Sequence, residues 1–155
     1  MNPSVKMSCS LQGTVDELPQ FFARLEEWAE GLGASMALVS SFSLMLDELL
    51  TNVAMHAYQG RGGPVAVAIE FEAPAHLRAW LRDHGPAYDP TARKSADTGA
   101  DIEERDIGGL GVHFVKQLAD QFIYRREGDV NEVFVSRTLN SPAAAVKHMN
   151  DGGDA

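Results

Sequence analysis

Apolar residues recur at helical spacing in the middle of the chain. Between residues 46 and 57 they stand three or four positions apart, at Leu46, Leu49, Leu50, Val53, Ala54 and Ala57. Residues with this spacing share one side of an α-helix, so the segment predicts a helix with one buried face. The flanking sequence extends the predicted helix to residues 38–58.

Most of the remaining chain shows either strand or helix periodicity. Alternation of apolar and polar residues predicts strands over residues 5–11, 65–71, 76–83, 122–127 and 132–139. The last two form a predicted hairpin around Gly128 and Asp129. Another helix is expected to begin at a Thr14 or Asp16 cap and to end near Gly31. Its expected buried face consists of Leu18, Phe22, Leu25, Ala29 and Leu32.

Polar residues form a second stripe on the predicted helix 38–58. Glu48, Asn52 and His56 are four residues apart, and residues at that spacing lie one above another on a helix. The stripe presents a carboxylate, an amide and an imidazole in a row from a rigid element. Phosphoryl transfer needs a base, an oxygen ligand for a metal ion and a fixed geometry, which these side chains offer. The alternative is a solvated helix face without chemistry.

Two glycine-bearing segments follow this stripe in the sequence. Asp83 closes the apolar row of the predicted strand 76–83, so it points the same way as the core residues, and Gly85 comes just after it. Gly108-Gly-Leu-Gly111 opens a predicted short helix, where bare backbone amides favour a phosphate. Each segment alone is a common turn signal, but the order and spacing of all three pieces are specific.

Residues 84–107 show no convincing period and separate the two glycine-bearing segments. The stretch is polar and carries an acidic cluster at its end, Asp101, Glu103, Glu104 and Asp106. Structureless loops of this length are uncommon in compact domains and often act as lids or are disordered. A lid over residues 86–107 is expected, and the chain after residue 140 is expected to be a disordered tail.

Composition narrows the class of protein. A chain of 155 residues suggests one domain, and a net charge of -9 argues against a nucleic-acid binder, whose surface would be basic. We expect no transmembrane run and no signal peptide. Cys9 is the lone cysteine and has no partner for an internal disulfide. These features favour the cytoplasm.

The three pieces together resemble the GHKL ATP-binding superfamily, which includes histidine-kinase catalytic domains. The stretches at 47–58 (DELLTNVAMHAY), 83–90 (DHGPAYDP) and 108–116 (GGLGVHFVK) are most similar to the bacterial anti-sigma-factor serine kinases. The resemblance covers residues 5–139. Gly85-Pro86-Ala87 replaces the Gly-x-Gly of the wider superfamily, although this form suits the anti-sigma subgroup, and the small Ala87 still permits a ligand to approach.

The resemblance implies specific roles for residues of this chain. It implies that Asn52 holds Mg²⁺ between the protein and the phosphates of ATP, that Glu48 acts as the catalytic base and that Asp83 binds the adenine amino group. The rest of the implied nucleotide site consists of His56, Gly85, Ala87, Arg105, Gly108, Gly109, Leu110 and Gly111. His56 is expected to act as a structural hydrogen-bonding residue, and Arg105 or Arg93 to reach phosphate from the lid.

The implied fold is α+β, a two-layer sandwich with a mixed, mostly antiparallel sheet, helices on one face and an ATP lid. Residues 1–140 would form the kinase domain and residues 141–155 the tail. The implied activity is an ATP- and Mg²⁺-dependent serine/threonine protein kinase that phosphorylates an anti-sigma-factor antagonist and sequesters a sigma factor. A homodimer is a further expectation, and no nucleic-acid or membrane partner is expected.

Three alternatives remain open at the level of sequence. The chain could bind ATP and switch partners without transferring phosphate, although Glu48 argues against this. It could be the catalytic domain of a histidine kinase, although the residues ahead of Val5 leave no room for a dimerising helical hairpin. It could also be an interaction domain that binds no nucleotide, which an ATP-dependent rise in melting temperature would contradict.

Overall fold

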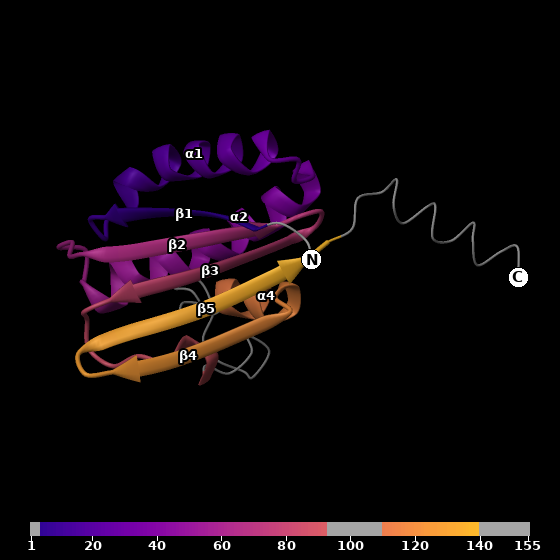
Figure 1. The fold of residues 1–155 in the computed structure, drawn as a ribbon. Helices are drawn as coiled ribbons and strands as arrows, with labels where there is room; N and C mark the ends of the chain where they lie inside the picture. The colour runs from indigo at the N-terminus through magenta and orange to yellow at the C-terminus, as the bar shows by residue number, and fades with distance from the viewer. Residues whose placement is uncertain (1–3, 93–109, 140–155) are drawn as a thin grey trace, which may run out of the picture.

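The chain forms a five-stranded sheet with helices packed against one face (Figure 1). The computed structural model describes residues 4–92 and 110–139. The strands are β1 (Ser4–Leu11), β2 (Val65–Glu72), β3 (His76–Asp83), β4 (Gln121–Glu127) and β5 (Val130–Thr138). The helices are α1 (Leu18–Gly31), α2 (Met36–Asn52) and α4 (Leu110–Leu118), with short helical turns at η1 (Val15–Glu17), η2 (Val53–Ala57) and η3 (Pro90–Ala92). The expected two-layer α+β sandwich is confirmed.

The strands lie in the order β1-β2-β3-β5-β4, so β3 occupies the centre of the sheet. Every pairing between these strands is antiparallel. The sheet expected to be mixed is therefore antiparallel throughout the described residues, because hairpin-like connections join β2 to β3 and β4 to β5. Asp83, the last residue of β3, lies opposite Asn131 of β5.

One face of the sheet supplies the core. Along β2 and β3, buried residues alternate with more exposed ones, and the buried set packs against α1, α2 and α4. Phe21 of α1 is buried where Phe22 was expected, and Leu32 is 38% exposed. The predicted helix is therefore confirmed. Its buried face is rotated slightly from the predicted one, and Leu32 does not belong to it.

Helix α2 is the central element of the helical layer. It begins at the Ser35 cap, whose hydroxyl accepts a hydrogen bond from the Leu38 N–H at 3.1 Å. The segment Met36–Ala57 is long and apolar enough to cross a membrane by length and composition alone, a test that the core helix of a soluble protein also passes. Its apolar residues Leu38, Phe42, Met45, Leu46, Leu49 and Leu50 belong to the buried core of the domain.

The last turn of the predicted helix 38–58 is not α-helical. Residues Val53–Ala57 form a π-helical turn, in which the Tyr58 N–H donates to the Val53 carbonyl at 3.1 Å. Such a turn contains one residue more than an α-helical turn and often lies at a functional site.

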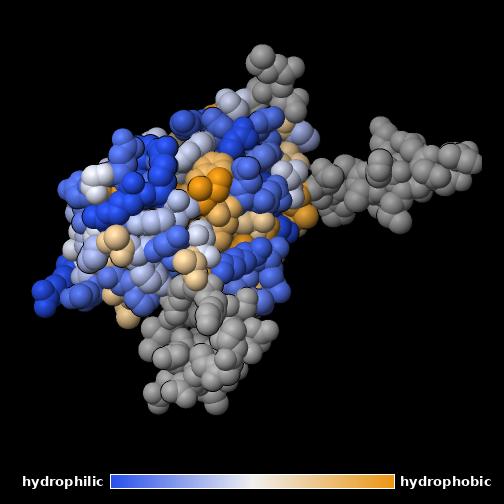
Figure 2. Space-filling view, turned by 90° about the horizontal axis from the view of Figure 1, so that it is seen from below, coloured by the Kyte–Doolittle hydropathy of each residue, from blue (hydrophilic) through white to orange (hydrophobic). Residues whose placement is uncertain are grey.

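The surface at the β4 edge of the domain is mostly hydrophilic, with hydrophobic area gathered near its centre (Figure 2). Ile123 of β4 and Phe114 of α4 are large apolar residues that remain exposed on these two elements. The candidate site lies elsewhere, at the end of the sheet where β3 stops.

Candidate functional site

A small cavity lies between helix α2 and the end of the central strand. Its volume is about 30 Å³, comparable to the space that one water molecule takes up in the liquid. Its walls come from α2, the π-helical turn, β3, β5 and the segment after β3. The lining residues are Leu49, Asn52, Val53, Ala57, Leu81, Asp83, Tyr88, Pro90, Asn131 and Val133. Apolar walls with a few polar groups are the lining that small-molecule sites have, although such sites usually measure roughly 300–1,000 Å³.

Asp83 supplies the carboxylate of this cavity. The residue is 6% exposed and faces the core side of the sheet, as the alternation along β3 predicted. Its Oδ1 accepts one hydrogen bond from the Gly85 N–H at 2.9 Å and another from Asn131 Nδ2 at 2.9 Å. A buried carboxylate needs such donors, and this one has them on a single oxygen.

Asn52 faces the same cavity from the last residue of α2. It is 6% exposed, and its buried Nδ2 has no hydrogen-bond partner among the described residues. An amide left partly unpaired in the interior costs free energy, so its position calls for an explanation other than stability. The burial also rules out the alternative that this part of the polar stripe is a solvated face.

Glu48 lies one helical turn before Asn52 and is only partly buried. Partial burial raises the pKa of the Glu48 carboxyl, and the neighbouring carboxylate of Asp47 raises that pKa further. A carboxylate with a raised pKa is a better proton acceptor, which suits a general base.

His56 does not continue the stripe at helical spacing. The π-helical turn adds a residue between Asn52 and Tyr58, which offsets His56 from the four-residue repeat. Its ring instead stacks on Tyr88, with ring centroids 5.1 Å apart and planes 15° apart. His56 thus contacts the segment after β3 through its ring, and the hydrogen-bonding role expected for it stays a prediction.

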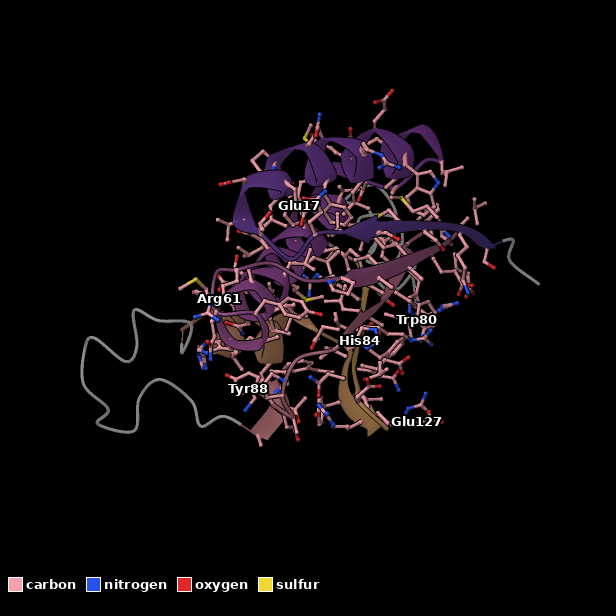
Figure 3. All side chains as sticks on the ribbon, turned by 90° about the vertical axis from the view of Figure 1, so that its left-hand side faces the viewer. Glu17, Arg61, Trp80, His84, Tyr88 and Glu127 are labelled. Carbon is pink, nitrogen blue, oxygen red and sulfur yellow. The ribbon has the colours of Figure 1, made fainter. Side chains whose placement is uncertain are left out.

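Tyr58 and Gly85 hold the end of α2 close to the loop after β3. The Tyr58 hydroxyl accepts a hydrogen bond from the His84 N–H at 2.8 Å and donates one to the Pro64 carbonyl at 2.6 Å. Gly85 is buried directly against Ala57, and a Cβ on Gly85 would lie 2.5 Å from the Ala57 Cβ. Figure 3 shows His84 and Tyr88 at this end of the molecule, and Trp80 on the face of the sheet away from the helices.

Comparison with known proteins identifies the family of this arrangement. The model of the histidine kinase-like ATPase domain matches residues 11–137, which is most of the chain. The chain belongs to this family.

Two curated relatives of this histidine kinase-like ATPase domain are protein kinases. The serine/threonine-protein kinase BtrW of Bordetella bronchiseptica is 27% identical over 111 residues, which cover 71% of this chain and 75% of the relative. The serine-protein kinase RsbW of Listeria monocytogenes is 30% identical over 107 residues, which cover 64% of this chain and 67% of the relative. These are relatives at modest identity.

A solved structure shows the same fold. The structure of the RsbU and RsbW domains of a Mycobacterium tuberculosis protein superposes with a TM-score of 0.64 at 16% identity. The match covers 90% of this chain and 34% of that one. At this identity the likeness concerns the fold alone, and it confirms the two-layer sandwich.

Several sequence-predicted site residues of the ATPase domain lie outside the described residues. They are Arg93, Arg105, Gly108 and Gly109, together with most of the expected lid 86–107 and the tail 141–155. Leu110 and Gly111 are the first residues of α4. Ala87 is exposed, beside the buried Gly85 and the exposed Pro86.

Sequence reasoning missed Asn131, Tyr58 and Tyr88, which also belong to the site. Asn131 could have been found from the same signal that singled out Asp83, because it precedes Val133 and Val135 on the inward face of β5. Tyr58 carried no such signal, because its role depends on contacts with residues distant in sequence.

Proposed function

We propose that this chain is an ATP-dependent serine/threonine protein kinase of the anti-sigma-factor type. The observation that carries the proposal is the pair of buried polar residues, Asp83 and Asn52, on one cavity with Glu48 a helical turn away. The family match and the two kinase relatives support this reading. In this proposal the chain phosphorylates an anti-sigma-factor antagonist and, in its other state, sequesters a sigma factor.

Each residue of the site receives a role. Asp83 accepts a hydrogen bond from the adenine amino group, because a buried carboxylate oxygen can only accept. Asn52 would offer its amide oxygen to Mg²⁺. Glu48 takes the proton from the serine hydroxyl that attacks the γ-phosphorus, while the bond from that phosphorus to the β–γ bridging oxygen breaks and ADP leaves. Bound Mg²⁺ would supply charge neutralisation of the phosphates.

The polar side chains present fit the adenine amino group and the ion. The Asn52 amide is buried and its Nδ2 has no partner among the described residues, so no hydrogen bond of that atom opposes a 180° turn of the amide that presents its oxygen there. No cluster of three or more acidic, histidine or cysteine side chains suited to a metal ion occurs in the described part of the chain. Mg²⁺ keeps several waters and seldom occupies an all-protein cage, so one amide oxygen and the phosphates can hold it.

A nucleobase needs more room than the cavity offers. At about 30 Å³ the cavity admits water but no purine ring. Tyr88 and Pro90 form the wall that belongs to the segment leading toward the expected lid. We propose that this wall moves outward when ATP binds, and that backbone amides around 108–111 contact the phosphates.

The proposal also includes the bounds of the domain, its location and its oligomeric state. Residues 1–140 would be the kinase domain, acting in the cytoplasm on protein partners as a possible homodimer. The partner-switch alternative differs from the kinase only in phosphate transfer, so one measurement separates the two.

The test is a transfer assay with the purified chain. Protein partners captured from the source cell with and without Mg²⁺·ATP are incubated with labelled ATP and the chain. Incorporation of label on serine or threonine of a captured partner supports the kinase. ATP binding without incorporation into any partner favours the non-catalytic switch, and absence of ATP binding in calorimetry contradicts both.

A further inference from the structure

The carboxylate of Asp83 is held in one orientation by donors that reach only one of its oxygens. Gly85 N–H and Asn131 Nδ2 both donate to Oδ1, each at 2.9 Å. Among the described residues no donor reaches Oδ2. Because two donors converge on Oδ1, the second oxygen is the one left for a ligand in the cavity.

The amide of Asn131 is itself held in one orientation. The residue is 3% exposed. Its Oδ1 accepts hydrogen bonds from the Tyr124 hydroxyl at 2.5 Å and from an Arg126 guanidinium nitrogen at 3.0 Å. A guanidinium group can only donate, so the amide oxygen must face Arg126 and the amide NH₂ must face the other way.

The groups on the far side of Asn131 fit the same orientation. Its Nδ2 also lies 2.9 Å from the Pro86 carbonyl and 3.2 Å from the Gly85 carbonyl. Both carbonyls can only accept, so a flipped amide would place its oxygen against two acceptors. Arg126 also donates directly to the Gly85 carbonyl at 3.0 Å, which ties the loop after β3 to β4.

We propose that Asn131 is a positioning residue that sets the base specificity of the site. Its NH₂ group holds Asp83 Oδ1 in place, so that the other carboxylate oxygen, an acceptor, points at the bound purine. A purine with an amino group at position 6 then finds a partner, whereas a purine with an oxygen there meets acceptor against acceptor. This inference rests on the proposed function, since it takes Asp83 as the residue that meets the base.

The same geometry makes a specific statement about the variant Asp83→Asn. Gly85 N–H and Asn131 Nδ2 would hold the carbonyl oxygen of the new amide in the former Oδ1 position. Its NH₂ group would then face the purine, where it can donate to an oxygen at position 6. The variant should therefore invert the base preference and bind inosine triphosphate more tightly than ATP.

Calorimetry with ATP and inosine triphosphate, each with Mg²⁺, tests the proposal. The parent should prefer ATP by roughly ten- to a hundredfold, as expected for one hydrogen bond to a charged group. Asp83→Asn should reverse the sign of that preference. In Asn131→Ala, the ratio of the two affinities should fall toward one, because the Asp83 carboxylate loses the hydrogen bond from Asn131 and can swing away from the base. Ser136→Ala is the control, since Ser136 is buried on the same strand, outside the cavity lining, and should keep the parental ratio.

The outcomes distinguish a failure of the proposed function from a failure of the role proposed for Asn131. A parent that binds neither nucleotide contradicts the proposed function. A parent that prefers ATP, with an Asp83→Asn variant that loses both nucleotides to the same extent, contradicts the role of Asn131 and leaves the proposed function standing. If Asn131→Ala fails to fold in circular dichroism, the sign of the preference in Asp83→Asn decides by itself.

Discussion

Tyr58 joins the end of helix α2 to the backbone of His84. The His84 N–H donates to the Tyr58 hydroxyl at 2.8 Å, and that hydroxyl donates to the Pro64 carbonyl at 2.6 Å. Because His84 directly follows Asp83, the phenol sets how far the Asp83 carboxylate lies from the helix that carries Asn52. The Tyr58 hydroxyl thus connects the segment of Asp83, proposed to bind the base, to the helix of Asn52, proposed to bind Mg²⁺.

Tyr58→Phe should weaken this connection without removing the ring. Both hydrogen bonds are lost, and each contributes about 0.5–1.5 kcal/mol to the free energy of unfolding in typical proteins, with exposed bonds at the low end. We expect a loss of about 1 kcal/mol in urea unfolding and weaker ATP binding in calorimetry. A variant with the parental unfolding free energy and ATP affinity would show that the hydroxyl holds nothing in place.

Gly85→Ala should destabilise the fold through a clash. A Cβ at this position would lie 2.5 Å from the Ala57 Cβ and 2.9 Å from the Ala57 carbonyl oxygen. Overpacking of this kind costs about 1–3 kcal/mol, measured as a lower urea midpoint at an unchanged slope. Gly31→Ala is the matched control, because nothing lies within 4 Å of its would-be Cβ. Equal midpoints for the two variants would contradict the close packing of Gly85 on α2.

Asn52→Ala should weaken Mg²⁺-dependent ATP binding, because it removes the protein oxygen assigned to the ion. The expected loss appears in calorimetry with Mg²⁺ present and shrinks when the ion is replaced by EDTA. Thr51→Ala serves as the control, since Thr51 lines a separate groove shared with Leu44 and Asp47. Equal Mg²⁺·ATP affinity in the Asn52 variant and the parent would falsify the assignment.

Glu48→Gln should abolish phosphate transfer and spare ATP binding. The amide keeps the size of the side chain but cannot take a proton, and loss of a general base lowers rates by about 10²–10⁴. Single-turnover assays with labelled ATP and a protein substrate provide the measurement. Asp47→Asn, on the exposed side of the same helix, should transfer phosphate at nearly the parental rate. Loss of ATP binding in the Glu48 variant would instead place Glu48 beside the metal ion.

The raised pKa of Glu48 predicts a pH dependence of stability. Burial and the Asp47 carboxylate disfavour the ionised form in the folded state, so the folded pKa lies above the unfolded one. The contribution of protonated Glu48 to stability is therefore fully present below the unfolded pKa and is lost as pH rises through the folded pKa. Relative to the parent, Glu48→Gln should gain stability at neutral pH and lose that gain in acid. Melting curves that shift equally at both pH values would contradict this.

Much of the fold follows from the periodicity of the sequence. Alternation along residues 76–83 predicts strand β3, its buried face and the inward direction of Asp83. The same rule applied to Asn131 would have found the residue opposite it. These inferences succeed because a strand has a strict two-residue repeat, and a polar residue on its buried face therefore stands out.

Other parts of the site depend on contacts that no local pattern encodes. The helix period predicted His56 above Asn52, but the π-helical turn moves it to the ring of Tyr88. That turn is stabilised by Tyr58, whose ring packs against Gly63 and whose hydroxyl bonds to His84. Tertiary contacts of this kind override the intrinsic helix repeat.

The π-helical turn Val53–Ala57 also makes the helix one residue longer than a regular α-helix over the same turn. A turn with an i to i+5 hydrogen bond is equivalent to a single-residue insertion into an α-helix. Met55, which is 52% exposed within the turn, makes the least buried contribution to it. A chain that lacked Met55 could close a regular i to i+4 turn from Val53, which would bring Tyr58 to the same place beside Gly63. Deletion of Met55 should therefore leave Tyr58 in place and be accepted by the core, as should substitutions of Met55.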